Sequence, residues 1–482
     1  MAEGLRKDKI SFASSLAADE KKAKNYVSLA PKKNYRKINP ETVLLQTSFV
    51  FGKINMNPAN TTSQSLQATP PGKGFSSSIF NAAVIVAALG YFVDIYDLVL
   101  FSIVRIPSLK GLGVTGSQLM SDGIFLINMQ MFGMLVGGVF WGILGDKKGR
   151  LSILFGSIIT YSLANIANGF VSSIEMYAAL RFIAGIGLAG ELGAGITLVV
   201  EVMPKEIRGY GTMIVAGVGV SGAVLAYFVA EAFDWRNAYF IGGGLGLALL
   251  VLRIGVYESG MFSKVKDEQT KRGDFFSLFT DAKRFVRYVR CVLVGVPLWV
   301  VVGILVTFSP EFAVAMGVSE TVSGGRAIMF CYVGITLGDF LTGYLSQRFQ
   351  SRKKVLFTFL VFDSLCIAAY FLLGKIVALP TANTVYAVVL LLGLSSGYWA
   401  IFVTVAAEQF GTNLRATVAT TAPNFVRGSL VPMTALFRTF TPALGLIGAG
   451  LAVSGFAMTI AFICLWGLDE TFGKELNYTE TI

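Results

Sequence analysis

The chain contains no histidine among its 482 residues. Histidine titrates in the physiological range and is the commonest metal ligand, so its absence excludes a histidine metal site and a histidine proton relay. Any proton chemistry must therefore use carboxylates. The four cysteines, Cys291, Cys331, Cys366 and Cys464, lie far apart in apolar stretches and form no CxxC pair. This spacing favours small buried hydrophobic residues, and we expect neither a metal nor a cofactor.

Charged residues are also scarce, at 14% of the chain against 54% hydrophobic residues. A soluble domain is typically about 25% charged, so this composition indicates a membrane protein. The sequence has no P-loop pattern, which argues against ATP-driven activity. It also has no nucleophile–base constellation, so we do not expect an enzyme. No apolar segment follows the first charges, so we do not expect a signal peptide.

What the chain has in abundance is apolar stretches long enough to cross a bilayer. A spanning helix needs roughly 20 mostly apolar residues, and only helices and closed barrels can span. The stretches show no alternation of period two, so we predict an all-α integral membrane protein with twelve transmembrane helices. The predicted spans are residues 79–104, 122–145, 152–171, 175–200, 210–232, 237–257, 288–312, 326–347, 355–374, 384–407, 418–440 and 443–467.

The formal net charge of +11 is unevenly distributed along this topology. Most of the 40 lysines and arginines fall on one side of the predicted spans, in the N-terminal tail and in alternate loops. The positive-inside rule assigns that side to the cytoplasm. We therefore predict a multi-pass protein of the cell (inner) membrane, with both termini cytoplasmic. The basic excess reflects topology, so the lipid bilayer is an expected partner and nucleic acid is not.

The longest internal break between spans divides the chain into two groups of six. We predict a mostly disordered cytoplasmic N-terminal tail, two six-helix bundles, a cytoplasmic linker and a cytoplasmic C-terminal tail. A regulatory or partner-binding arm is the alternative interpretation of the first segment. The N-terminal tail covers residues 1–78, and the two bundles cover residues 79–262 and 288–468. The linker covers residues 263–287, and the C-terminal tail covers residues 469–482.

The two halves echo each other in sequence. A glycine and a charged loop between spans two and three recur between spans eight and nine, at an offset of 201 residues. Glu201 and Arg208 lie seven residues apart after span four, and Glu408 and Arg415 lie seven apart after span ten. These repeats predict two pseudo-symmetric six-helix bundles. Many secondary transporters are built from such repeats around a site near the midplane.

Two acids in span one, Asp94 and Asp97, are candidate proton carriers. A charge at the bilayer centre costs at least about 2.5–3.5 kcal/mol, so an acid there needs a reason. Their i, i+3 spacing places both on one helix face. At helical rise Arg181 of span four reaches the depth of Asp94, so alternation between an Arg–Asp pair and a protonated Asp could couple protons to helix movement. A purely structural ion pair is the alternative.

Two further buried charges are candidates. Glu191 lies among the glycines of span four. Either it takes part in substrate binding or proton coupling, or it is an acid in a water-filled cavity on a face where helices pack closely. Arg427 lies well inside span eleven, where a guanidinium can bind a carboxylate or phosphate through two hydrogen bonds. We expect Arg427 to contact an anionic group of a substrate. The alternative is that Arg427 pairs with Asp339 or Asp363.

The loop Gly142-Ile-Leu-Gly-Asp146-Lys-Lys-Gly-Arg150 resembles the signature of the major facilitator superfamily between spans two and three. The resemblance covers residues 79 to 475. The run from Asp94 to Asp97, and Gly190-Glu191-Leu-Gly193, are similar to its metabolite:proton symporter branch, although Ile95 replaces an aromatic residue. This resemblance implies the major facilitator fold, with the span-four arginine in proton coupling. It also implies a cytoplasmic gate, with residues Asp146, Arg150, Glu201, Arg208, Glu408 and Arg415.

Together these features predict a secondary active transporter that works by alternating access. We expect proton-coupled symport of a small polar metabolite, an organic anion or a zwitterion, by a monomer whose other partners are protons and lipid. A sugar or phosphate symporter and an exporter are the alternatives within transport. A membrane sensor built on a transporter fold is the alternative from another class.

Overall fold

The computed structural model describes residues 82–148, 150–193, 195, 208–258, 275–474 and 478–480. The predicted N-terminal tail and residues 263–274 of the predicted linker lie outside this part. The domain boundaries at those places therefore stay predictions.

The first half of the described chain is a series of helices that matches predicted spans one to six. The elements are α4 (Ala82–Gly111), α5 (Gln118–Lys148), α6 (Arg150–Asn168), α7 (Ile174–Leu188), α9 (Arg208–Val220), α10 (Gly222–Ala232) and α11 (Trp235–Glu258). Span five is divided, because the helix is interrupted at Ser221 between α9 and α10.

The second half begins with a short 3-10 helix and then follows predicted spans seven to twelve. The elements are η2 (Phe275–Phe279), α12 (Ala282–Val300), η3 (Val301–Val306), α13 (Ser309–Ala315), α14 (Gly324–Phe349), α15 (Arg352–Ile376), α16 (Ala382–Ser395), α17 (Trp399–Glu408), α18 (Thr412–Gly428) and α19 (Leu430–Trp466). Span seven contains the π-helix η3, and span ten is interrupted between α16 and α17.

Nine helices of the described residues are long and apolar enough to cross a membrane. One of the nine runs from Asn413 to Trp466, over 54 residues, which is far longer than a bilayer requires. Gly445 divides this segment, because its φ of 68° lies in the left-handed region that glycine adopts readily. With this division, and with the shorter α6 and α7, the predicted all-α fold of twelve spans is confirmed.

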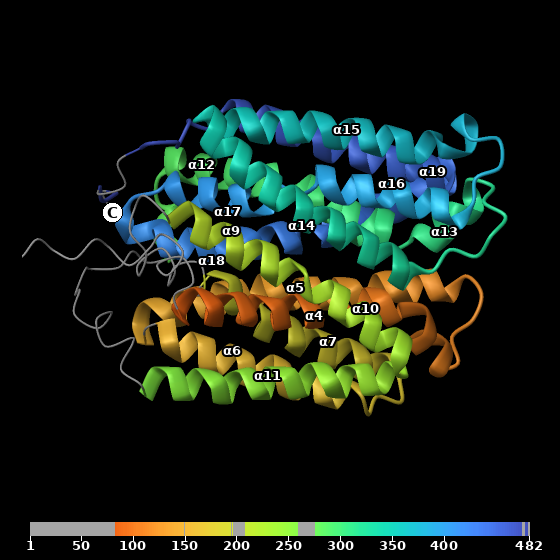
Figure 1. The fold of residues 1–482 in the computed structure, drawn as a ribbon, viewed down its shortest axis with the longest axis horizontal. Coiled ribbons are helices and arrows are strands. Elements are labelled where there is room, and N and C mark those ends of the chain that lie inside the picture. The colour runs from red at the N-terminus through yellow and green to blue at the C-terminus, as the bar shows by residue number, and fades with distance from the viewer. Residues whose placement is uncertain are drawn as a thin grey trace, which may run out of the picture. The chain divides into compact units, whose positions relative to one another are not determined.

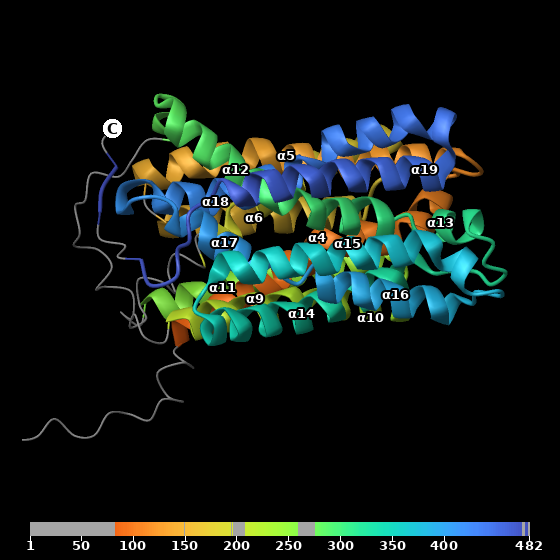
Figure 2. The same ribbon diagram turned by 90° about the horizontal axis from the view of Figure 1, so that it is seen from above.

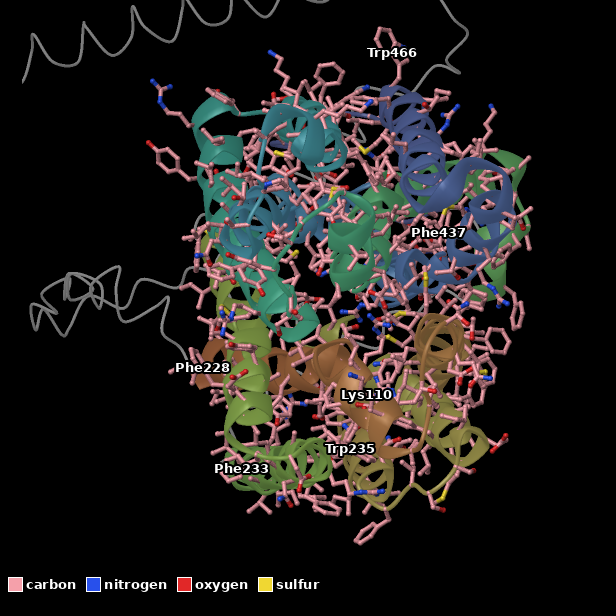
Figure 3. The ribbon with its side chains drawn as sticks, turned by 90° about the vertical axis from the view of Figure 1, so that its right-hand side faces the viewer. Lys110, Phe228, Phe233, Trp235, Phe437 and Trp466 are labelled. Carbon is pink, nitrogen blue, oxygen red and sulfur yellow. The ribbon has the colours of Figure 1, made fainter. Side chains whose placement is uncertain are left out.

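The helices run side by side along one direction, in two groups (Figures 1 and 2). Figure 3, which looks down the helices, shows Phe228 and Phe233 on the first group and Trp466 on the second. These three apolar side chains are 58%, 51% and 84% exposed on the outer surface. In a membrane such a surface faces lipid rather than water. The two groups meet where α4 contacts α14 and where α5 contacts α18.

Within the first group, glycines allow the backbones of α5 and α7 to approach closely. A Cβ atom on Gly185 of α7 would overlap the carbonyl oxygen of Gln130 on α5. A Cβ atom on Gly133 of α5 would overlap the carbonyl oxygen of Phe182 on α7. This packing matches the expectation that the span-four glycines permit close helix contact. It also places Arg181 of α7 directly beside α5.

Candidate functional site

Asp94 and Asp97 lie one helical turn apart on α4, and both are fully buried. Within the described part of the chain, neither Asp94 oxygen has a hydrogen-bond partner, and the side chain nearest to hydrogen bonding with Asp97 is the Asn165 amide. Their surroundings differ, because the Asp97 carboxyl lies against Gly242 of α11 and interacts electrostatically with Arg181. Asp94 instead interacts electrostatically with Arg427 of the other half. The two acids of span one therefore have different charged neighbours, one in each half of the protein.

Arg181 is fully buried on α7 and donates a hydrogen bond from Nη2 to the Gln130 side chain. Its guanidinium carbon lies 5.3 Å from the centre of the Phe101 ring and 5.8 Å from that of Tyr239. Such distances allow cation–π attraction. The predicted ion pair between Arg181 and Asp94 is not formed in this structure. Arg181 interacts instead with Asp97, one turn further along α4.

Glu191 forms a buried ion pair with Arg253 of α11. Arg253 donates to both carboxylate oxygens, with 2.9 Å between Nη1 and Oε2. The pair rests against the backbone of α4, because a Cβ atom on Gly90 would overlap both side chains. In the sequence, Arg253 lies inside a predicted span, but no acid could be named as its ion-pair partner. An arginine inside an apolar stretch was the signal that such a partner existed.

Arg427 is buried on α18 between two tryptophan rings. Its guanidinium carbon lies 5.5 Å from the centre of the Trp399 ring and 5.8 Å from that of Trp299. Nη1 donates a weak hydrogen bond of 3.4 Å to Asn424, while Nε and Nη2 have no hydrogen-bond partner in the described part of the chain. Arg427 thus presents two free donors beside two aromatic faces.

The alternative that Arg427 pairs with Asp339 or Asp363 is not realised in this structure. Asp339 of α14 accepts a hydrogen bond from the backbone N–H of Ala400, at 3.0 Å. Asp363 of α15 accepts hydrogen bonds from Ser395 at 2.7 Å and Ser396 at 3.1 Å. Both acids are fully buried next to the interruption of span ten.

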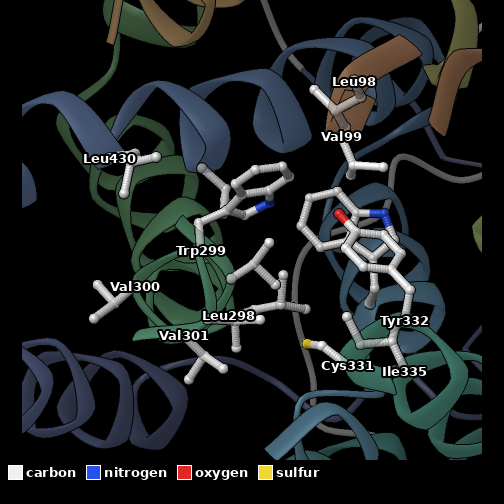
Figure 4. Close-up of a cluster of buried hydrophobic side chains, with 14 of the residues drawn as sticks. Leu98, Val99, Leu298, Trp299, Val300, Val301, Cys331, Tyr332, Ile335 and Leu430 are labelled. Atoms are coloured by element: carbon white, nitrogen blue, oxygen red, sulfur yellow. The ribbon is translucent and has the colours of Figure 1, made fainter. Parts of the chain in front are cut away.

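Aromatic side chains join the two halves at this level. The Trp399 indole of α17 donates to the Tyr91 hydroxyl of α4, at 2.9 Å. Tyr91 lies one turn before Asp94 and interacts electrostatically with both Asp94 and Arg427. Figure 4 shows Trp299 and Tyr332 of the second half in one buried cluster with Leu98 and Val99 of α4. Both aromatic and charged side chains therefore converge where α4 meets the second half.

The predicted cytoplasmic gate is only partly described. Glu201 lies outside the described residues, and the side chains of Asp146, Arg150 and Arg208 are not described. Glu408 forms an ion pair with Arg352, the first residue of α15, at 2.8 Å. Arg415 donates to the Phe410 carbonyl oxygen at 3.4 Å and interacts electrostatically with Glu408. Arg352, which lies on a neighbouring span, is a further charged residue at this end that the sequence did not single out.

An ion pair that the sequence did not predict joins the halves at the opposite end of the helices. Arg105, near the end of α4, contacts Glu311 of α13 through distances of 2.7 and 2.9 Å. Arg105 also donates to the Thr307 carbonyl oxygen and lies 4.5 Å from the centre of the Phe308 ring. Since Arg105 is 1% exposed, this contact closes that end of the interface between the halves.

Twelve spans in two groups, with buried ionisable groups where the groups meet, define a polytopic membrane transport protein. The chain belongs to the Major Facilitator Superfamily, whose family model matches residues 75–430. The resemblance in the loop after span two and in spans one and four is therefore confirmed at the level of the family.

Characterised relatives and a solved structure agree with this assignment. The niacin transporter NiaP of Acinetobacter baylyi is 27% identical over 69% of this chain and 80% of its own length. The gentisate transporter of Corynebacterium glutamicum is 25% identical over 70% of this chain and 76% of its own length. The proton:xylose symporter XylE matches 83% of this chain and 98% of its own, with a TM-score of 0.64 and 17% identity. At that identity the likeness shows the shared fold alone.

Proposed function

We propose that the protein is a proton-coupled symporter of a small organic anion, and that the anion is a flat, aromatic carboxylate. The observation that carries this proposal is Arg427, which is buried between the rings of Trp299 and Trp399 and has two nitrogens, Nε and Nη2, without a hydrogen-bond partner among the described residues. A carboxylate can accept two hydrogen bonds from one guanidinium, and an aromatic ring can stack on tryptophan. The relatives support the same class, since niacin and gentisate are both aromatic carboxylic acids.

In this proposal the proton site is the pair Asp94 and Asp97. Asp94 and the bound carboxylate would compete for the positive charge of Arg427, which interacts electrostatically with Asp94 in this structure. Protonation of Asp94 then leaves the guanidinium to the substrate, so that anion and proton bind together. Asp97 interacts electrostatically with Arg181 of α7. Glu191 is held by Arg253 and would contribute to coupling through this ion pair rather than as a free acid.

Transport would follow alternating access, with the two halves rocking about the site. Opening at one end requires the Arg105–Glu311 ion pair to break. Opening at the other end requires separation of Asn424 of α18 from the Ala189 carbonyl oxygen, which are 2.8 Å apart. The residues Asp146, Arg150, Glu201, Arg208, Glu408 and Arg415 would gate the cytoplasmic side. We place the protein in the cell (inner) membrane as a monomer with both termini cytoplasmic.

The substrate arm of the proposal is tested with purified protein in proteoliposomes. Nicotinate, 2,5-dihydroxybenzoate, xylose and inorganic phosphate serve as probes under an imposed proton gradient. Hydrogen bonds to a charged group contribute about 1.5–3 kcal/mol, so Arg427→Gln should lower carboxylate affinity about 10- to 100-fold. Arg438→Gln, on the exposed part of the following helix, is the matched control and should transport normally. Preferred uptake of xylose, or unchanged carboxylate affinity in Arg427→Gln, would reject the substrate class.

The proton arm is tested by comparing two modes of transport. The double variant Asp94→Asn and Asp97→Asn should lose gradient-driven accumulation of the carboxylate probe. It should keep exchange of labelled for unlabelled probe across the membrane, because Arg427 is intact and exchange needs no net proton movement. Gradient-driven accumulation at the wild-type level in this variant would reject the assignment of the proton site to span one.

A further inference from the structure

Span ten is interrupted where its backbone packs closely against α14 and accepts a hydrogen bond from it. α16 ends at Ser395 and α17 begins at Trp399, so residues 396–398 are not helical. Gly397 in this interruption lies against Gly338 of α14, since a Cβ atom on Gly397 would overlap the Gly338 backbone. Thr342 of α14 donates to the Gly397 carbonyl oxygen at 2.9 Å. The interruption is therefore a built feature, and it leaves the first N–H groups of α17 without partners inside their own helix.

Asp339 of α14 supplies the acceptor for that helix end. It is fully buried and accepts the backbone N–H of Ala400 on Oδ1, at 3.0 Å. A carboxylate at the N-terminus of a helix is stabilised by the free N–H groups and by the helix dipole. The backbone N–H of Trp399 also acts on this carboxylate. Its second oxygen, Oδ2, is buried and has no hydrogen-bond partner among the residues that the structure describes. No ion pair to Asp339 occurs among the described residues.

The helix that Asp339 caps begins with a residue of the proposed substrate site. Trp399 is the first residue of α17, one position before Ala400. Its indole donates to Tyr91 of the first half, and its ring lies beside the guanidinium of Arg427. A change in how firmly Asp339 holds the start of α17 therefore acts on the aromatic wall next to Arg427.

We propose that Asp339 is a second proton-binding site, located in the C-terminal half, whose occupancy sets the position of Trp399. A proton from water binds the unpartnered Oδ2 and converts the carboxylate into a carboxylic acid. Oδ1 then accepts the Ala400 N–H as part of a neutral group, and hydrogen bonds to ionised groups are roughly twice as strong as neutral ones. Protonation thus loosens the start of α17, whereas deprotonation tightens it.

Other ionisable groups on the elements packed around α14 must be distinguished from Asp339. They include Tyr91, Asp94, Asp97 and Arg105 on α4, Tyr227 and Glu231 on α10, Glu311 on α13, Arg352, Asp363 and Tyr370 on α15, Tyr386 on α16 and Glu408 on α17. Tyr91 interacts electrostatically with Asp339 and also accepts the hydrogen bond of Trp399. Asp94 is thus the main alternative proton site, since a change in its charge could act on Trp399 through Tyr91. Asp363 is the natural control, because it lies at the same interruption but accepts from serine hydroxyls.

The experiment follows tryptophan fluorescence of the purified full-length protein against pH, without any transported solute. The contribution of Trp399 is the difference between wild type and Trp399→Phe. We expect this contribution to change in a protonation step in wild type, in Asp363→Asn and in Asp94→Asn. In Asp339→Asn the step should disappear. Its persistence in Asp339→Asn, or its loss in Asp94→Asn alone, would overturn the proposal.

A second variant keeps the test decisive if Asp339→Asn does not fold. Asp339→Glu retains the acid but moves it by one methylene relative to Ala400, so the midpoint of the Trp399 step must shift. An unchanged midpoint would overturn the proposal. The inference takes its functional meaning from the proposed transport of a carboxylate, but its test does not depend on that function. A protein that shows the step and carries no carboxylate refutes the proposed function alone, and a carboxylate carrier without the step refutes this inference alone.

Discussion

Inside the predicted spans, the two halves of this transporter bury charge in different ways. In the first half, an acid and an arginine come together as a buried ion pair, Glu191 with Arg253. In the second half, Asp339 and Asp363 are held by a backbone N–H and by hydroxyl groups. Arg427, buried inside span eleven, has no acid as an ion-pair partner among the described residues.

This difference matters because an ion pair and a hydrogen-bonded acid respond differently when one charge is removed. Both members of a buried ion pair lose their hydration, so removing one member strands the other. A carboxyl held by hydroxyls can lose its charge while the donors turn to other acceptors. The first half is therefore the electrostatically rigid partner, and the second half can more easily gain or lose single charges. The same fold thus supports two kinds of polar interior.

The largest effect is expected for the Glu191–Arg253 pair of the first half. Glu191→Gln and Arg253→Gln should each lower the free energy of unfolding by about 3–5 kcal/mol, because each strands a buried charge. The double variant should lose much less than the sum of the two. Thermal unfolding in detergent measures all three, with Arg438→Gln as the exposed control. Strictly additive losses would show that the two side chains do not stabilise each other and would remove one side of the comparison.

A smaller effect is expected at Asp363 in the second half. Asp363→Asn keeps an acceptor for Ser395 and Ser396, so it should cost about 1 kcal/mol. Asp363→Ala removes the acceptor, but the Ser395 hydroxyl already lies 2.9 Å from the Leu392 carbonyl oxygen and can turn to it. We expect a cost of about 1–3 kcal/mol there, again from thermal unfolding. A loss in Asp363→Asn as large as in Glu191→Gln would contradict the contrast between the halves.

The sequence predicted the architecture better than the contacts between buried charges. Twelve spans follow from apolar length, and the turn between spans eleven and twelve was placed close to Gly445. Spacing along one helix was enough to put Asp94 and Asp97 on one face. The partner of Asp94 was expected to be Arg181, because depth in the bilayer was the only coordinate that the sequence supplied.

Depth alone does not tell which side of a helix faces which neighbour. Arg181 and Arg427 both reach the level of span one, but only packing shows that Asp97 interacts with Arg181 and Asp94 with Arg427. For the same reason Arg253, Arg352 and Arg105 could not be matched to their acids, which lie on other spans. The interruption of span ten was also missed, since residues 384–407 read as one apolar run.

The smallest effect is expected at the end of the second half, outside the membrane-spanning segments. Glu470 follows α19 and accepts the backbone N–H groups of Arg352 and Lys353, at 3.0 and 3.2 Å, and the Ser351 hydroxyl. Burial raises the pKa of Glu470, but the hydrogen bond from Ser351 and those from the backbone outweigh it. The pKa therefore lies below its ordinary value of 4.5.

A lowered pKa in the folded protein fixes the sign of the pH dependence. The ionised Glu470 stabilises the fold above the pKa of the unfolded chain, and this stabilisation is lost as the pH falls through the folded-state pKa. Glu470→Gln should therefore unfold at a slightly lower temperature than wild type at pH 7, and the difference should shrink below about pH 4.5. Thermal unfolding of both proteins over this range measures it. A difference that grows toward acid pH would mean that Glu470 is protonated in the fold, so that this end of the second half does not hold its acid through hydrogen bonds to the ionised form.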